Sequence, residues 1–166
     1  MKIIFLASCT LLALVAACDC PKADPPPPVF SLAFSADTAN ASGRGFRRAE
    51  VRSAYLVRYA TADFRQLLDT LRQRRPRFID EQTLDIGYYP GQPPRFYLND
   101  RISNSVFARS FVLVLPAAAR RYSITNLVIA QEVGSGRCPD TRTTRNEATV
   151  NGQVLSALGA LPELSK

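Results

Sequence analysis

The 166-residue chain has no histidine and no tryptophan, and its single methionine is Met1. Without histidine, the Ser-His-Asp and Cys-His ways of activating a nucleophile are excluded, as is every zinc site that needs a histidine ligand. The sequence contains no G-x-S-x-G motif, phosphate-binding loop or dinucleotide fingerprint. These absences favour a domain that is not an enzyme and that uses neither a metal ion nor a cofactor.

Long apolar runs are missing as well. A membrane-spanning helix needs about 20 apolar residues, whereas the run Ile3–Ala17 is roughly 15 residues long and is interrupted at 8–10. Lys2 precedes this run and small residues end it, which is the design of a secretory signal. The sequence therefore predicts a signal peptide over residues 1–17 and export of the rest of the chain.

The end of this leader, Leu14-Val15-Ala16-Ala17-Cys18, resembles the lipobox of bacterial lipoproteins. The resemblance implies cleavage before Cys18, diacylglycerol on its sulfur and an acyl chain such as palmitate on its amino group. Ordinary signal peptidase cleavage at the same bond is the alternative. We expect a lipid-anchored protein of the bacterial cell envelope, in the outer rather than the inner membrane, facing the periplasm or the surface.

Cysteine is scarce, and its count bears on the anchor. Loss of the leader leaves Cys18, Cys20 and Cys138, an odd number of thiols in an oxidising compartment. Lipidation of Cys18 removes the odd thiol, because a thioether cannot also form a disulfide. The expected disulfide therefore joins Cys20 to Cys138.

The remaining composition indicates a tether and one basic domain. Residues 18–28 contain five prolines and no apolar pattern, which predicts a semi-rigid polyproline II tether. We expect one domain over residues 29–156 and a tail at 157–166. The net charge is +7, and arginine supplies 18 of the 21 basic side chains. A basic exported surface favours envelope proteins or anionic glycans and lipids as partners, and not nucleic acid.

Alternating apolar residues predict strands along most of the domain. The clearest case is Val51–Tyr59, whose odd-numbered residues would share one face. A central strand should stop at Pro116, a later strand should bulge at Thr125-Asn126, and Asn151-Gly152 predicts a hairpin. The other expected strands cover 29–34, 83–88, 95–98, 107–115 and 122–129.

One segment has helical spacing instead. Phe64, Leu67, Leu68 and Leu71 recur at intervals of three and four, which predicts a helix over 62–74. The alternative is an extended crossover with Leu68 and Thr70 facing inward.

About seven short strands separated by turns predict a mainly β fold. We expect an antiparallel β-sandwich of immunoglobulin-like or transthyretin-like type with one short helix. A small β-barrel with a capping helix is the alternative. The last third of the chain, with a Tyr122-x-Ile124 strand, a loop carrying Cys138 and a Val150-Asn151-Gly152 hairpin, resembles small lipoproteins of Bacteroidota. That resemblance implies an envelope location and no particular activity.

The best candidate for recognition is the loop at 88–94, Tyr-Tyr-Pro-Gly-Gln-Pro-Pro. Its Tyr88, Tyr89 and Gln92 would supply contact area and hydrogen bonds at low entropy cost, as loops on β scaffolds often do. An ordinary turn without a ligand is the competing interpretation.

Asp80, Glu81 and Asp85 form the acidic cluster of the chain. A solvated turn is the simple interpretation, and a carboxylate pair for glycan hydrolysis is the alternative. The hypothesis that follows is a non-enzymatic binding, accessory or structural module of the envelope. A carboxylate-dependent glycan hydrolase and a carrier of a small apolar ligand are the competing hypotheses.

Overall fold

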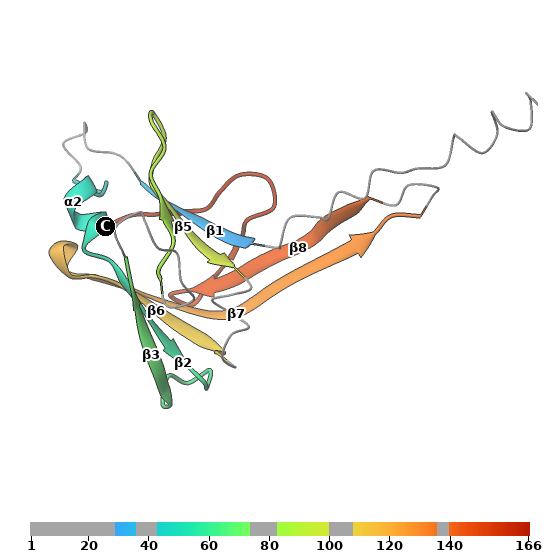
Figure 1. Cartoon of the computed structure of the whole chain (residues 1–166), viewed down its shortest axis with the longest axis horizontal. Helices are drawn as coiled ribbons and strands as arrows, with labels where there is room; N and C mark the ends of the chain where they lie inside the picture. The colour runs from blue at the N-terminus through green and yellow to red at the C-terminus, as the bar shows by residue number, and fades with distance from the viewer. Residues whose placement is uncertain (1–28, 36–42, 74–82, 100–107, 136–139) are drawn as a thin grey trace, which may run out of the picture.

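The computed structural model describes residues 29–35, 43–73, 83–99, 108–135 and 140–166, which form a β-sandwich (Figure 1). In chain order its elements are β1 (Val29–Phe34), α2 (Arg48–Arg52), β2 (Tyr55–Tyr59), β3 (Leu67–Arg72), β4 (Ile86–Gly87), β5 (Arg95–Asn99), β6 (Ser110–Leu115), the 3₁₀ turn η1 (Pro116–Ala118), β7 (Arg120–Val133), β8 (Thr141–Val150), β9 (Gln153–Ser156) and β10 (Glu163–Leu164).

The strands form a four-stranded sheet, β10-β1-β5-β4, and a six-stranded sheet, β3-β2-β6-β7-β8-β9. The named strand pairs are antiparallel, apart from β1 with β10. The predicted fold class is confirmed, because the described strands make two open sheets and α2 is the one α-helix among the described residues. Residues 157–166, expected as a tail, include β10 at the edge of the smaller sheet.

The core lies between the two sheets. Successive side chains of a strand point to opposite faces, so alternate apolar residues of each sheet meet in the middle. Each fully buried side chain of this size contributes about 1.5–3 kcal/mol. The largest of them are Phe30, Leu32, Phe34, Leu56, Leu71, Phe96, Leu98, Phe111, Leu113, Leu115 and Ile124.

The helix predicted over 62–74 is wrong. The Thr61 hydroxyl accepts from the N–H groups of Arg65 and Gln66 at 3.2 and 3.4 Å, and Phe64 takes a positive φ of 61°. These features make a turn, after which β3 pairs with β2. Sheet pairing therefore overrides the helical spacing, and Leu67 is left 60% exposed.

The facing predicted for β2 is also wrong. Leu56 and Arg58 point into the core, and the odd-numbered residues of the strand are on the other face. Arg58 is only 2% exposed, and its guanidinium donates to both carboxylate oxygens of Asp69 at 2.7 and 2.5 Å. A buried arginine is tolerated here because it is paired and hydrogen-bonded.

Several local predictions are confirmed. β6 is a central strand that stops at Pro116, and the β7–β8 register shifts between Thr125 and Val128. Asn151 and Gly152 take positive φ values of 48° and 83°, as a two-residue hairpin turn requires.

β7 and β8 continue together past the other strands (Figure 1). β6 pairs with β7 as far as Thr125, and β9 pairs with β8 from Glu147 onward. We call the two-stranded part, residues 129–133 and 141–146, the β-arm. At its base, Asn146 Nδ2 donates to the Val29 carbonyl at 3.0 Å.

Candidate functional site

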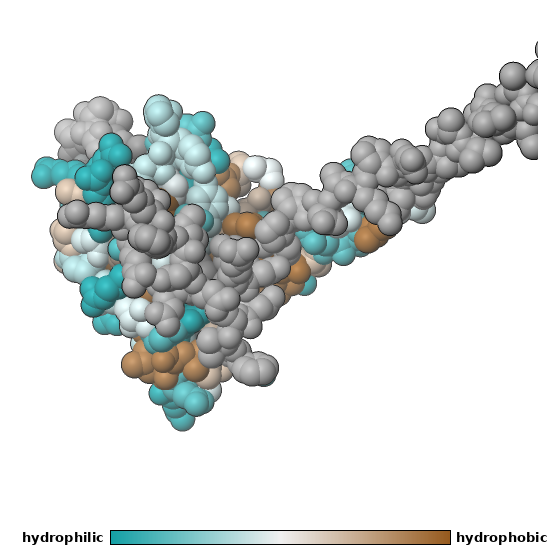
Figure 2. Space-filling view, in the orientation of Figure 1, coloured by the Kyte–Doolittle hydropathy of each residue, from teal (hydrophilic) through white to brown (hydrophobic). Residues whose placement is uncertain are grey.

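A β-turn closes the loop between β4 and β5. The Gln92 N–H donates to the Tyr89 carbonyl at 3.2 Å, and Gly91 takes a positive φ of 70°. Proline followed by such a glycine favours a type II turn. The Phe34 N–H donates to the Pro94 carbonyl at 2.9 Å, which ties the loop to β1. Figure 2 shows this loop, at the top of the view, as a pale to teal and therefore polar surface.

The ring of Tyr89 lies against Gly87, the last residue of β4. A Cβ added at Gly87 would lie 2.7 Å from Cε2 of Tyr89 and 3.0 Å from Cε2 of Tyr97. The absent side chain of Gly87 thus lets the tyrosine rings rest close to the sheet. Tyr89 nevertheless stays 51% exposed, so its ring is both held in place and open to solvent.

Two side chains of β5 complete the group around Tyr89. The Arg95 guanidinium lies 5.9 Å from the centre of the Tyr89 ring, and its Nη2 donates to Gln92 Oε1 at 2.6 Å. Burial raises the pKa of Tyr97, and the neighbouring Tyr89 hydroxyl raises it further, whereas Arg95 acts in the opposite direction. We call Tyr89, Gln92, Arg95 and Tyr97 the tyrosine–arginine cluster. It combines an aromatic ring, a cation, an amide and hydroxyl groups on one face.

Asp85 lies on the same outer face of the smaller sheet. Leu84 and Ile86 belong to the core, so the side chains at 85 and 87 point away from it. The Tyr97 N–H donates to the Asp85 carbonyl at 3.2 Å. Loss of water around the Asp85 carboxyl raises its pKa. The other two members of the predicted acidic cluster, Asp80 and Glu81, lie outside the described residues.

Tyr88 points the other way and is packed against the core. Its hydroxyl donates to Gln73 Oε1 at 3.1 Å, and the Arg48 guanidinium lies 5.3 Å from the centre of its ring. Gln73 Nε2 in turn donates to the carbonyls of Val51 and Ala54 at 2.8 and 3.2 Å. The Val51 carbonyl also accepts from the Ala54 N–H at 3.1 Å, so Gln73 adds a second hydrogen bond there and holds the segment that leaves α2. Tyr88 therefore joins the loop to α2.

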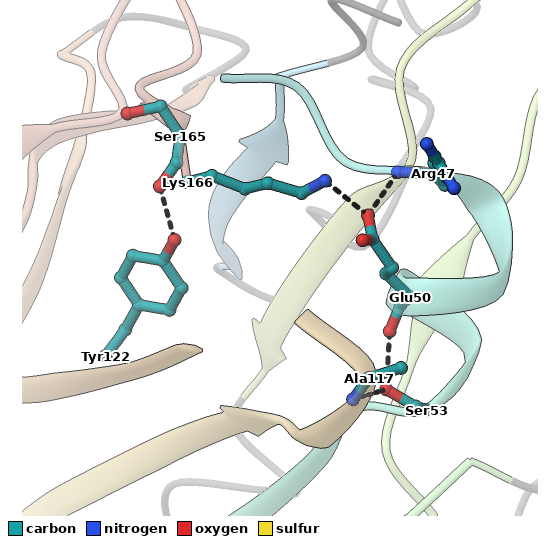
Figure 3. A network of polar contacts seen from close by, with 7 residues as sticks. All are labelled: Arg47, Glu50, Ser53, Ala117, Tyr122, Ser165 and Lys166. Atoms are coloured by element: carbon teal, nitrogen blue, oxygen red, sulfur yellow. Dashed lines mark hydrogen bonds and ion pairs between the residues drawn. The ribbon is translucent and has the colours of Figure 1, made fainter. Parts of the chain in front are cut away.

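The last residues of the chain also contact α2 (Figure 3). Lys166 Nζ lies 2.8 Å from Glu50 Oε2, which also accepts from the Arg47 N–H at 2.7 Å. The hydrogen bond from Lys166, followed by that from Arg47, lowers the pKa of Glu50. Nearby, the Tyr122 hydroxyl donates to the Ser165 carbonyl at 2.5 Å. We call Glu50, Lys166, Gln73 and Tyr88 the α2 clasp.

The structure separates the predicted recognition residues. It brings Tyr89 and Gln92 together in the cluster and assigns Tyr88 to the α2 clasp. The lipidation residue Cys18 and the disulfide pair Cys20 and Cys138 lie outside the described residues. Within the described part of the chain, no three acidic, cysteine or histidine side chains gather in a way that could hold a metal ion. In that same part, no helix has both the length and the apolar character needed to cross a membrane.

Sequence reasoning missed Gly87, Arg95 and Tyr97. A signal for the last two was present, because Arg95 and Tyr97 alternate with Phe96 and Leu98 along β5 and must face away from the core. The role of Gly87 had no comparable signal. This role becomes visible only once the loop has placed the Tyr89 ring against the backbone of β4.

An open hollow of about 590 Å³ lies at the far end of β2, beside the turn at 60–63 and Arg109. Asp63 and Arg109 line it together with Ala60 and Ala62, and it opens to solvent. It is a surface hollow, which does not supply the internal cavity expected of a carrier for an apolar ligand.

No family model, no curated protein and no solved structure matches this chain.

Proposed function

We propose that the protein is exported and lipid-anchored through Cys18 in the bacterial cell envelope, and that it acts there as a non-enzymatic binding domain. Its contact surface is the tyrosine–arginine cluster. The observation that carries the binding role is the Tyr89 ring, half exposed yet fixed against Gly87. A ring that is already ordered loses little conformational entropy on binding.

The contrast between two arginines supports this assignment. Arg58 is buried and forms paired hydrogen bonds with Asp69, as a structural arginine should. Arg95 Nε is enclosed but has no hydrogen-bond partner in the described part of the chain. A buried donor without a partner beside an exposed aromatic ring is a feature found at functional sites.

The anchor is supported by the leader, and the proposed disulfide is supported by the base of the β-arm. Val29, the first described residue, accepts a hydrogen bond from Asn146. Cys20 and Cys138 stand nine and eight residues before these two positions. Extended segments of those lengths reach about 28 Å at about 3.1 Å per residue and about 26 Å at about 3.3 Å. Because Val29 and Asn146 are in contact and the two segments have similar lengths, Cys20 and Cys138 can reach the same place, which is compatible with the proposed disulfide.

Lipidation is tested on the full-length protein expressed in a bacterium that processes lipoproteins. The wild type should remain in the membrane fraction after a high-salt wash, and its intact mass should show residues 1–17 removed and acyl chains added. Cys18→Ala should leave the membrane fraction, because only the lipid holds the protein there. Retention of this variant after the wash would contradict the anchor.

The disulfide is tested by alkylating thiols before and after reduction of the same extracted protein. We expect no free thiol before reduction, and a lower free energy of unfolding after it, by up to about 4 to 5 kcal/mol for a loop of this length. Two free thiols before reduction would exclude the Cys20–Cys138 bridge.

The binding role is tested by retention of the detergent-extracted protein on cell-envelope fragments. Tyr89→Ala should reduce retention, while Arg121→Gln, which removes an exposed charge from the other sheet, should not. Equal retention of the wild type and both variants would remove the cluster as the contact surface.

A further inference from the structure

We infer that the ligand of the tyrosine–arginine cluster is an acidic glycan, an oligosaccharide that contains uronic acid residues. This inference rests on the proposed binding function, and it specifies the ligand class from three neighbouring features of the surface.

The first feature is the aromatic ring. Tyr89 is 51% exposed and is positioned by Gly87 below it and Arg95 beside it. An exposed, pre-positioned ring suits the apolar C–H face of a sugar, because burial of that face removes apolar area from water without ordering the protein further. A bare phosphate or a peptide carboxylate would leave this ring unused.

The second feature is the single guanidinium within the cluster. Arg95 already donates Nη2 to Gln92 Oε1, which fixes the plane of its fork. A planar guanidinium matches a planar carboxylate, and charge-assisted bonds of this kind are about twice as strong as neutral ones. The acid group of a uronic acid lies on the sugar ring, so one residue can use Tyr89 and Arg95 together.

The third feature is a carboxylate further along the same face. Gly87 pairs with Arg95, and two residues earlier Asp85 lies beside Tyr97. Asp85 can accept hydrogen bonds from sugar hydroxyls, whereas it would repel a dense cluster of phosphates. The face thus carries a cation at Arg95, the hydroxyl groups of Tyr89 and Tyr97, and an acceptor at Asp85. This arrangement favours a ligand whose sugar residues each carry one acid group and several hydroxyl groups.

The experiment is a titration of the detergent-extracted full-length protein with three probes: a galacturonic acid tetrasaccharide, its methyl ester, and inorganic polyphosphate. The acidic tetrasaccharide should bind, and the neutral ester should bind at least about tenfold more weakly, because the charge-assisted pair is lost. Polyphosphate should bind more weakly than the acid and without dependence on Tyr89.

The variants separate the ring from the charge. Tyr89→Ala should weaken binding of both the acid and the ester. Arg95→Gln should weaken binding of the acid by much more than binding of the ester, because the ester loses only the support that Arg95 gives to the Tyr89 ring. Arg95→Lys keeps the charge but not the fork, and should fall between the wild type and Arg95→Gln. Arg121→Gln is the matched control and should bind as the wild type does. Unfolding midpoints of all variants must be unchanged for these comparisons to hold.

Equal affinity for the acid and its ester, with continued dependence on Tyr89, would overturn the acidic class and leave the binding function intact. Tighter, Arg95-dependent binding of polyphosphate would replace the glycan with a phosphate-bearing ligand. If the tetrasaccharide fails to bind while Tyr89-dependent retention on envelope fragments persists, the inference is wrong and the proposed function stands. Loss of the Tyr89 dependence in that retention assay would instead refute the function itself.

Discussion

Tyr88 and Tyr89 are neighbours in the chain, yet their side chains belong to two regions with different roles. Tyr88 belongs to the α2 clasp, where its hydroxyl bonds to Gln73 and its ring packs against the core. Tyr89 belongs to the tyrosine–arginine cluster, where its ring is held by Gly87 and Arg95 but remains half exposed. One region uses its polar groups to hold the fold together. The other holds an aromatic ring at the surface, beside an arginine whose Nε has no hydrogen-bond partner among the described residues.

The sharpest test of this difference is truncation of each tyrosine. Tyr88→Ala should lower the free energy of unfolding by about 2–3 kcal/mol, because it removes core packing and leaves the Gln73 amide oxygen without its partner. Tyr89→Ala should change it by no more than about 0.5 kcal/mol. Urea unfolding of the two variants measures both values. Equal losses would mean that the two tyrosines do the same structural work.

The sequence predicted the loop as a candidate site, but it did not predict the different roles of its two tyrosines. Tyr88, Tyr89 and Gln92 were all candidates because tyrosine and turn residues occur together there. Which tyrosine points outward depends on Gln73, which directly follows β3, and on the absent side chain of Gly87. Neither contact can be inferred from the residues around the loop, because both form only when segments distant in the sequence meet in the fold.

The second test moves the Tyr89 ring without removing it. In Gly87→Ala the new Cβ would lie 2.7 Å from Cε2 of Tyr89, so the ring must be displaced from the sheet. We expect ligand affinity to fall by about tenfold, while stability changes by less than about 1 kcal/mol. A titration with the acidic tetrasaccharide and urea unfolding measure the two quantities. Unchanged affinity would show that the position of the ring is unimportant.

At the level of the fold, the sequence was reliable where turn residues and alternation agreed. Pro116 and Asn151-Gly152 define strand ends by backbone chemistry alone, and both act as predicted. The predicted facing failed at β2, because apolar residues occur at both odd and even positions and a buried arginine, Arg58, lies at a core position. The sequence prediction also failed at 62–74, where the leucines satisfy a helical spacing but the β2 edge offers a better set of hydrogen bonds.

The third test acts on the other side of the α2 clasp. Folding lowers the pKa of Glu50 below its ordinary value of 4.5, so the folded protein holds this proton less tightly than the unfolded chain. The contribution of Glu50 is therefore complete above pH 4.5 and is lost as the pH falls through the folded pKa. Glu50→Gln should cost about 1 kcal/mol at pH 7 and much less near pH 3. Asp63→Asn, which removes an exposed carboxylate paired with Arg65, is the matched control and should cost less than Glu50→Gln at pH 7 in urea unfolding.

The smallest expected effect is also the most direct test of contact within the cluster. The Tyr89 hydroxyl contributes to the raised pKa of Tyr97, after burial. Tyr89→Phe keeps the ring but removes that hydroxyl, so the pKa of Tyr97 should move back toward its ordinary value of 10.0. The raised pKa of Tyr88, which burial causes, should not change, because its hydroxyl bonds to Gln73 on the other side of the loop. NMR titration of the tyrosine rings at alkaline pH resolves the two groups, with Tyr55→Phe as a control outside the cluster. A shift of Tyr88 alone would mean that the two regions are coupled through the loop rather than separated by it.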